Sequence, residues 1–339
     1  MTSTLADRVA APHSLDVPDA ALGLAWRPLA PEHVAELFRL VAAVEDADRC
    51  PYRTSRDELE ESLADPALDL STDSLGGWDE TGTLRAWATV QQPPGDTTTV
   101  RAFLSGGVDP AWRGRGVGTA LLAWSQGRGR QRIAESGKDV PARIGIYVED
   151  DATSTVALAA RAGFSPIRYY TQMRRSLGSG VPVGGAPSGV VVTPWTQALD
   201  DATRLAHNEA FADHWGSQPQ TAEQWAQGRT LQVPSWSFVA VDEASGDVVG
   251  YQLSSRYEQD WDVVGYTYGY CDLLGVRPAH RGRGIAVALL VAGMLAYRED
   301  GMQFAALDVD TANPSGAHGL YASLGYEVTH GSRLMTIEL

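Results

Sequence analysis

The stretch Val276-Arg277-Pro278-Ala279-His280-Arg281-Gly282-Arg283-Gly284-Ile285-Ala286 decides the fold of this chain. An apolar run leads into it, and apolar residues and strong helix formers follow from Val287 to Tyr297. This order predicts a strand, a Gly/Arg turn and a helix. Glycines in such a turn remove side chains that would block an anion, and the helix start directs backbone N–H groups and a positive dipole end to the same place. The stretch therefore predicts a phosphate-binding turn.

The same pattern occurs earlier in the chain, as Val108-Asp109-Pro110-Ala111-Trp112-Arg113-Gly114-Arg115-Gly116-Val117-Gly118. An apolar helical run, Ala120 to Trp124, follows this copy as well. Similar landmarks recur later in both halves, such as the glycines Gly163 and Gly325 that end a helical pattern. A chain of 339 residues is long enough for two domains with a core each. The repeat therefore predicts two copies of one domain.

Each copy reads as a mixed α/β unit in which helices alternate with strands. In the first copy we expect strands at 22–29, 84–91, 98–108, 142–148 and 169–173, and helices at 31–43, 55–63, 120–132 and 152–161. In the second we expect strands at 190–195, 236–241, 248–254, 266–276, 304–309, 326–329 and 334–337, and helices at 200–214, 221–229, 285–297 and 313–325. The sequence divides into a flexible lead (1–20), a first domain (21–176), a Gly/Ser/Pro-rich linker (177–189) and a second domain (190–339).

The charge balance limits the partners. The formal net charge is −15, and the part from Ser188 onward has 8 Arg, no Lys and 18 Asp plus Glu. Binding to a nucleic-acid backbone requires a basic surface, so we expect no nucleic-acid partner. An acidic surface attracts cationic small molecules, although acidic residues retained for solubility would give the same balance.

Cysteine use and hydropathy favour a cytoplasmic protein. The two cysteines, Cys50 and Cys271, give no disulfide framework and no metal-binding spacing. No apolar run reaches the roughly 20 residues of a membrane span, and the first residues show no secretory pattern. His207, Glu209, Asp213 and His214 fall in one predicted helix, but His207 and His214 are about 10 Å apart along its axis, too far to share one ion. We expect no metal, and place this helix beside the acceptor.

With these motifs in place, the chain resembles the GNAT acyltransferase superfamily over nearly its whole length. The family's signature, Arg/Gln-x-x-Gly-x-Gly/Ala at a strand–helix junction, stands here as residues 113–118 and 281–286. The later pattern Asn313…Leu320-Tyr321…Leu324-Gly325-Tyr326 is similar to the family's fourth helix and its exit. The resemblance implies an α/β fold with a mixed sheet, acetyl-CoA as co-substrate, and transfer of acetyl to a primary amine of a small molecule.

The resemblance also implies which residues bind acetyl-CoA. Both copies retain the strand end and the Gly/Arg turn, and the second copy adds an Asn near the pantetheine arm. A structural role would also explain Asn313, because Asn followed by Pro is common at the start of a helix. The expected coenzyme-binding residues are Val276, Arg281, Gly282, Arg283, Gly284, Ile285, Ala286 and Asn313 in the second domain, and Val108, Arg113, Gly114, Arg115, Gly116, Val117 and Gly118 in the first.

Tyr321 and Asp272 are the expected catalytic residues. A phenol, with a reference pKa of about 10, stays protonated at neutral pH and can protonate the leaving thiolate. Tyr321 would otherwise be a core aromatic, since Leu320 and Leu324 share its helical pattern. Asp272 shares a strand face with Tyr270 and is the candidate base, acting directly or through water, unless it is simply a polar residue facing solvent.

The first domain lacks both groups. Counting back from Gly163 places Ala159 where Tyr321 stands, and counting back from Val108 places Leu104 where Asp272 stands. We therefore expect a catalytically degenerate first domain and a catalytic second domain. The tandem arrangement is similar to the mycothiol synthase family, in which the second domain performs the chemistry.

Several alternatives stay open at this point. The acceptor could be a cysteinyl amine, as in the mycothiol synthase family, an aminoglycoside or a polyamine. A protein of another class, a sensor that binds acyl-CoA without transfer, would also retain the turns. Two domains in one chain already form a pseudo-dimer, so we expect a monomer.

Overall fold

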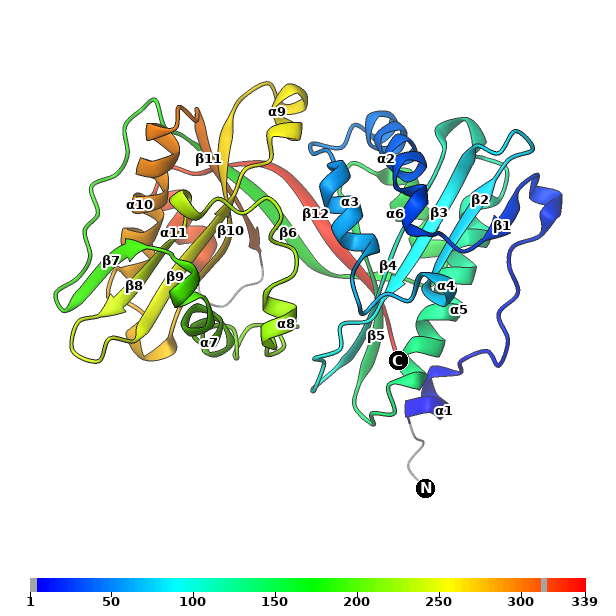
Figure 1. The fold of residues 1–339 in the computed structure, drawn as a ribbon, viewed down its shortest axis with the longest axis horizontal. Coiled ribbons are helices and arrows are strands. Elements are labelled where there is room, and N and C mark those ends of the chain that lie inside the picture. Colours follow the sequence, from blue (N-terminus) through cyan, green and yellow to red (C-terminus); the bar gives the residue numbers. More distant parts are fainter. Residues whose placement is uncertain (1–4, 312–315) are drawn as a thin grey trace. The chain divides into compact units, whose positions relative to one another are not determined.

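The computed structural model describes residues 5–311 and 316–339. The chain divides into two compact units: unit 1 runs up to Arg168 and includes Ser332–Leu339, and unit 2 runs from Tyr169 to Gly331. Each unit is a mixed sheet with helices on both faces, as Figure 1 shows. The predicted α/β class is therefore correct. Within the described ranges, none of the helices is long and apolar enough to cross a bilayer.

Unit 1 is built on the strand order β1-β2-β3-β4-β5, followed by the C-terminal part of β12. All neighbours are antiparallel except β4 and β5, which are parallel. The strands are β1 (Ala25–Arg27), β2 (Ser74–Trp78), β3 (Leu84–Gln91), β4 (Val100–Val108) and β5 (Ala142–Glu149).

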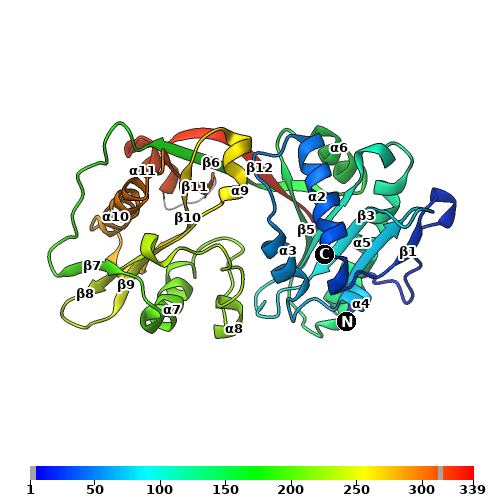
Figure 2. The same ribbon diagram turned by 45° about the horizontal axis from the view of Figure 1, so that its top comes forward.

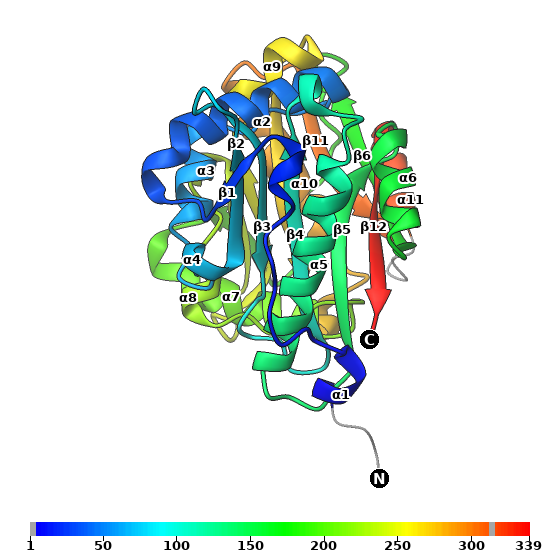
Figure 3. The same cartoon turned by 90° about the vertical axis from the view of Figure 1, so that its right-hand side faces the viewer.

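Helices cover both faces of this sheet (Figure 3). One face packs against α5 and α6 through an apolar core that includes Val117, Leu121 and Ala159. The other face packs against α2 and α3 around Leu37 and Trp78. The helices are α1 (Leu5–Val9), α2 (Val34–Asp48), α3 (Arg56–Leu63), α4 (Leu70–Asp73), α5 (Val117–Glu135) and α6 (Thr153–Arg161).

Unit 2 repeats this topology with the strand order β6-β11-β10-β9-β8-β7. Its parallel pair is β10 and β11, and the other neighbours are antiparallel. The strands are β6 (Ser165–Ser176), β7 (Val190–Pro194), β8 (Phe238–Asp242), β9 (Val248–Ser255), β10 (Tyr268–Val276), β11 (Phe304–Asp310) and β12 (Glu327–Glu338). Segment 177–189, the expected linker, contains neither helix nor strand.

The helices of unit 2 also lie on two faces, with α7 and α8 on one side and α10 and α11 on the other (Figure 2). Alternation along β9 shows this division: Tyr251 contacts His207 of α7, whereas Gln252 contacts Tyr297 of α10. The helices are α7 (Asp200–Ala210), α8 (Ala222–Trp225), α9 (Glu258–Val264), α10 (Ile285–Glu299) and α11 (Ala317–Ser323).

The compact units differ from the sequence division at two strands. The part of β6 from Tyr169 belongs to unit 2, where it pairs with β11 from Tyr170↔Asp310 to Ser176↔Phe304. The part of β12 from Ser332 belongs to unit 1, where it pairs with β5. We expected two closing strands at 326–329 and 334–337, but they form one strand of 12 residues. A strand pattern in the sequence does not identify the pairing partner, so this exchange could not be predicted.

The expected flexible lead also differs from the structure. Helix α1 packs against α5, with Leu5 2% and Val9 0% exposed in the core of unit 1 (Figure 3). Gln131 of α5 donates a hydrogen bond of 3.0 Å to the Pro12 carbonyl. A helix of five residues is too short for a periodic signal, which is why the sequence analysis missed it.

Strand β2 was missed because its sequence, Ser-Leu-Gly-Gly-Trp, has low strand propensity. Its glycines have a packing reason. A Cβ at Gly76 would lie 2.4 Å from the Trp78 ring, and a Cβ at Gly77 would lie 2.7 Å from the Trp26 ring. The glycines therefore make room for two tryptophan side chains.

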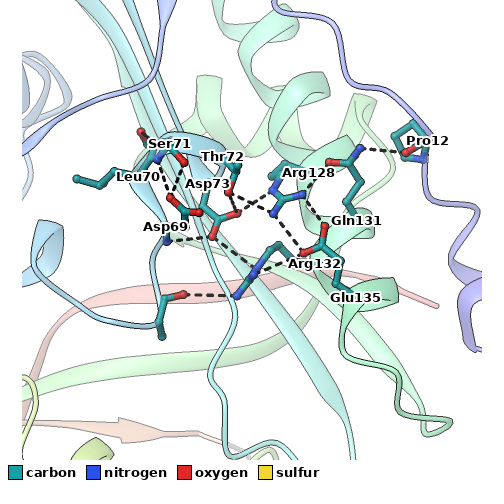
Figure 4. Close-up of polar contacts among 12 residues, drawn as sticks. Pro12, Asp69, Leu70, Ser71, Thr72, Asp73, Arg128, Gln131, Arg132 and Glu135 are labelled. Atoms are coloured by element: carbon teal, nitrogen blue, oxygen red, sulfur yellow. Dashed lines mark hydrogen bonds and ion pairs between the residues drawn. The ribbon is translucent and has the colours of Figure 1, made fainter.

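The long helix of each unit is attached to its sheet by buried polar contacts of different kinds. In unit 1, Arg128 of α5 donates to Asp73 (Nε–Oδ1 2.7 Å) and to Glu135 (Nη1–Oε1 2.8 Å), as Figure 4 shows. Asp73 is 0% exposed, so this cluster places charges inside the protein. In unit 2, α10 uses a neutral network instead: the Tyr297 hydroxyl lies 2.6 Å from Ser254 Oγ and accepts from Gln252 at 3.0 Å.

Candidate active site

The glycine turns of both units have the same backbone conformation. Gly282 and Gly284 have φ of 75° and 86°, and Gly114 and Gly116 have φ of 76° and 87°. Helices α10 and α5 begin directly afterwards, and neither has a side-chain cap at its first N–H groups. Such N–H groups, together with the helix dipole, bind phosphate. Both units therefore contain a backbone cradle of the kind that the sequence predicts for phosphate.

The first arginine of each turn forms an ion pair at the C-terminal end of a neighbouring helix, with Asp213 just beyond α7 and with Asp48 at the end of α2. Arg281 donates to both oxygens of Asp213, at 2.7 and 3.1 Å, and to the Val276 carbonyl at 3.3 Å. Arg113 makes the same contacts in unit 1, to both oxygens of Asp48 at 2.5 and 2.9 Å and to its own strand end. These guanidinium groups fix the shape of the turn, so the backbone N–H groups are the atoms available to phosphate.

The polar residues predicted beside the acceptor have other partners. Glu209 pairs with Arg277 at 2.8 Å, and Asp213 pairs with Arg281. His207 is buried, lies 2.6 Å from the Tyr251 hydroxyl, and has its pKa lowered to about 4 by burial, so it is neutral at pH 7. The described residues contain no group of three or more His, Cys, Asp or Glu side chains suited to a metal ion. Glu209 of α7 and Asp213, which follows this helix, therefore support the phosphate turn.

The two parallel strands of unit 2 separate in front of the turn. Their pairing runs from Tyr268↔Phe304 to Cys271↔Leu307 and ends there. On its other edge β10 stays paired with β9 as far as Val276. The Arg277 N–H donates to the Val249 carbonyl of β9. In an antiparallel pair the N–H groups of successive residues point to alternate sides, so those of Leu274 and Val276 point away from β9. They face the side on which β11 has separated. The split thus presents backbone groups to an elongated ligand.

Tyr321 lies at this split, on the face covered by α10 and α11. It is 8% exposed and belongs to the same apolar cluster as Cys271 and Leu307, the last paired residues. Burial raises its phenol pKa well above the usual value, with a further contribution from Cys271. Among the described residues its hydroxyl has no hydrogen-bond partner. Tyr321 is therefore a protonated phenol beside the point of strand separation.

Two carboxylates lie on the opposite face. Asp272 and Asp308 directly follow the last paired residues of β10 and β11, and both are exposed. Asp272 accepts a hydrogen bond of 2.8 Å from the Tyr257 hydroxyl. Asp308 interacts with the Tyr270 hydroxyl, and surrounding protein raises the pKa of its carboxyl.

Asp308 was not predicted as a site residue, and Tyr270 was predicted only as a neighbour of Asp272 on the same strand face. The one visible signal for Asp308 was a carboxylate inside an otherwise apolar strand, Phe-Ala-Ala-Leu-Asp-Val-Asp. Tyr257 was missed because α9, the helix that follows it, was not predicted. Asn313 lies outside the described residues.

A β-bulge distinguishes the second unit from the first. The register of β9 and β10 shifts between Cys271 and Leu273, which makes Asp272 an extra residue, whereas β3 and β4 pair without interruption. Counting along the sequence equated Leu104 with Asp272, and the structure corrects this. Leu104 faces the core as Cys271 does, and the bulge gives Asp272 no counterpart in unit 1.

The other polar positions of the site are occupied by different side chains in unit 1. Allowing for the bulge, Tyr270 and Asp308 correspond to Phe103 and Tyr147, whose rings stack at 5.8 Å. Ala159 occupies the place of Tyr321. The Phe164 N–H donates to the Ala159 carbonyl at 3.0 Å, and the Tyr326 N–H donates to the Tyr321 carbonyl at the same distance. Unit 1 has the cradle but neither the phenol nor the carboxylates at these positions.

Comparison with known proteins agrees with this geometry. The sequence model of the acetyltransferase (GNAT) family matches residues 40–164 and 200–326. A mycothiol acetyltransferase from Nocardia farcinica is 31% identical over 260 residues, which cover 74% of this chain and 78% of that protein. A GCN5-related N-acetyltransferase from Sphaerobacter thermophilus has a TM-score of 0.71 at 26% identity, covering 95% of this chain and 97% of that one. A tandem GNAT protein from the clavulanic acid biosynthesis pathway shares the fold, with a TM-score of 0.66 at 20% identity, covering 93% and 98%.

Proposed function

This chain belongs to the GNAT acetyltransferase family, and we propose that it transfers the acetyl group of acetyl-CoA to a primary amine at the strand split of unit 2. The observation that carries this proposal is the placement of Tyr321 on one face of the split and of Asp272 and Asp308 on the other. An acid and a base on opposite sides of one position suit the attack of an amine on a thioester and the departure of a thiolate.

The coenzyme would lie between the turn and the split. The N–H groups around Gly282 to Ala286 would hold the pyrophosphate, and the strand end at Val276 would receive the pantetheine arm. The same strand supplies N–H groups that can stabilise the negative charge developing on the thioester oxygen. In this arrangement the acetyl group would lie where β10 and β11 separate.

Tyr321 would protonate the leaving thiolate. Its raised pKa keeps the phenol protonated at neutral pH, so that it can donate a proton. A carboxylate on the opposite face would remove the proton of the amine, and Asp272 is the candidate that the sequence predicts.

Two observations suggest the class of acceptor: the similarity to a mycothiol acetyltransferase and the negative charge of the second half of the chain. Similarity to a mycothiol acetyltransferase favours a cysteinyl amine, and the acidic second half of the chain favours a cationic amine, such as a polyamine or an aminoglycoside. Unit 1 would act as a coenzyme-binding or purely structural partner, because it has Ala159 in place of Tyr321 and no carboxylate in place of Asp272 or Asp308.

The test is CoA release from acetyl-CoA with three acceptors: S-methyl-L-cysteine amide, spermidine and kanamycin. Tyr321→Phe should lower kcat about 10²–10⁴-fold, the usual contribution of a positioned acid. Tyr326→Phe is the matched control. The ring centroids of Tyr326 and Tyr321 are 5.9 Å apart, and both substitutions remove a tyrosine hydroxyl from the same cluster. Equal activity in wild type and Tyr321→Phe would contradict the assignment, and acetyl-CoA binding without release to any acceptor would favour a sensor.

A further inference from the structure

We propose that Asp308 receives the proton of the acceptor's ammonium group and that Asp272 holds that ammonium group in place. This inference rests on the proposed function and divides between two residues the role that the sequence gives to Asp272 alone. It assigns an acceptor that enters the site as a primary ammonium ion.

The first support is position. Asp272 and Asp308 are the first residues after the last paired residues, Cys271 and Leu307, so one carboxylate lies on each side of the opening split. Leu307 faces the cluster that contains Tyr321, and alternation along β11 therefore directs Asp308 to the opposite face. An amine between the two carboxylates would approach the thioester from the side opposite the acid.

The second support is the different surroundings of the two carboxylates. Asp272 is exposed and accepts a hydrogen bond from the hydroxyl of Tyr257, the residue that precedes α9. Asp308 is more crowded, and burial raises its pKa, with the Tyr270 hydrogen bond acting in the opposite direction. On the β6 side its neighbour in register is Gln172, which carries no charge. Different environments of this kind give paired carboxyl groups different roles.

The rings of the two tyrosines add a preference for a cation. Tyr257 and Tyr270 meet edge to face, with ring centroids 5.4 Å apart, and each binds one of the carboxylates. Aromatic rings beside anionic groups attract ammonium ions. In unit 1 the stacked pair Phe103 and Tyr147 replaces Tyr270 and Asp308, and no residue replaces Asp272.

The proton balance is complete. The ammonium ion gives one proton to Asp308, and the amine nitrogen then attacks the thioester carbon. The new C–N bond forms, the C–S bond breaks, and the thiolate leaves with the electron pair and takes a proton from Tyr321. The second nitrogen proton returns to Tyr321 through water, and Asp308 releases its proton to solvent, so one proton is released in each turnover.

The first test needs no acceptor. In the full chain labelled with ¹³Cγ-aspartate, NMR titration should show one carboxyl group that titrates above the ordinary aspartate range. This resonance should be absent in Asp308→Asn and should titrate at higher pH in Tyr270→Phe, because that variant loses a hydrogen bond to the charged form. An Asp308 resonance that titrates in the ordinary range would overturn the assignment, whatever the enzyme's activity.

The second test separates the two carboxylates kinetically, with the three acceptors named above. Asp308→Asn should lower kcat about 10²-fold. Asp272→Asn should raise the KM of the amine about tenfold and change kcat less than about threefold, since it loses one charge contact of about 1.4 kcal/mol. Tyr270→Phe should move the acidic limb of the kcat/KM profile to higher pH.

The reverse pattern, with kcat lost in Asp272→Asn and retained in Asp308→Asn, would overturn the division of roles while leaving the transferase intact. If no acceptor is acetylated by the wild type, the proposed function fails, and the NMR titration alone then decides whether Asp308 has the raised proton affinity.

Discussion

The two units have the same topology and the same glycine turn, yet they differ at the place where their parallel strands separate. In unit 2 this place holds Tyr321, Tyr270 and two carboxylates, and in unit 1 it holds Ala159 and a stacked aromatic pair. The turn depends on backbone atoms and glycines, so its conformation is the same in both units although the neighbouring side chains differ. The predicted chemistry depends on single side chains and on one bulged residue, which a duplicated domain loses easily.

The units also differ in the contacts that attach their long helices. Substitutions at these contacts should have larger effects than substitutions at the arginines of the turns. Asp73→Ala would leave Arg128 buried with Glu135 as its remaining close carboxylate, which should destabilise unit 1 by about 3 kcal/mol. Ser254→Ala in unit 2 removes the two neutral hydrogen bonds of the Ser254 hydroxyl, with Tyr297 and with Gln252, and should cost about 2 kcal/mol. Hydrogen exchange measured by mass spectrometry reports the two units separately.

Asp69→Ala serves as the control for Asp73→Ala, because Asp69 is an exposed cap of the same short helix. We expect faster exchange mainly in α4, α5 and β2 of Asp73→Ala. Equal loss of protection in both units, or a larger loss in Ser254→Ala, would contradict the distinction between a charged and a neutral attachment.

The smaller prediction concerns the arginines that fasten the turns. Asp213→Asn weakens the contact with Arg281 and should raise the KM of acetyl-CoA about three- to tenfold with little change in kcat, since loss of a charged hydrogen bond is worth roughly 1 kcal/mol. Asp48→Asn makes the same change in unit 1 and should leave steady-state kinetics unchanged. An equal effect of both substitutions would show that both coenzyme sites serve catalysis.

The sequence allowed much of the fold to be predicted, because glycine turns, apolar periodicity and the repeat are local signals. Strand β3 was predicted at its observed bounds, and most other elements were predicted within a few residues. The short elements α1, α4 and α9 escaped, since four to seven residues carry little periodicity. The exchange of β6 and β12 segments escaped because pairing is a tertiary property.

The site was predictable only in part. The turns and Tyr321 lie in recognisable patterns, whereas the position of Asp308 depends on how far β10 and β11 stay paired. The bulge at Asp272 shifts the correspondence between units by one residue, so counting along the sequence equated it with Leu104. Only three-dimensional pairing shows that Tyr270 and Asp308 share a face and meet.

The central claim, that unit 2 performs the chemistry and unit 1 does not, is tested most directly by a matched pair of glycine substitutions. Gly284→Asp and Gly116→Asp place the same carboxylate at equivalent positive-φ positions, and each opposes phosphate binding in its own unit. The measurement is kcat and KM for acetyl-CoA in the CoA-release assay, with circular dichroism to confirm folding. We predict that Gly284→Asp abolishes turnover and that Gly116→Asp retains most of kcat; loss of turnover in Gly116→Asp with activity retained in Gly284→Asp would contradict the account.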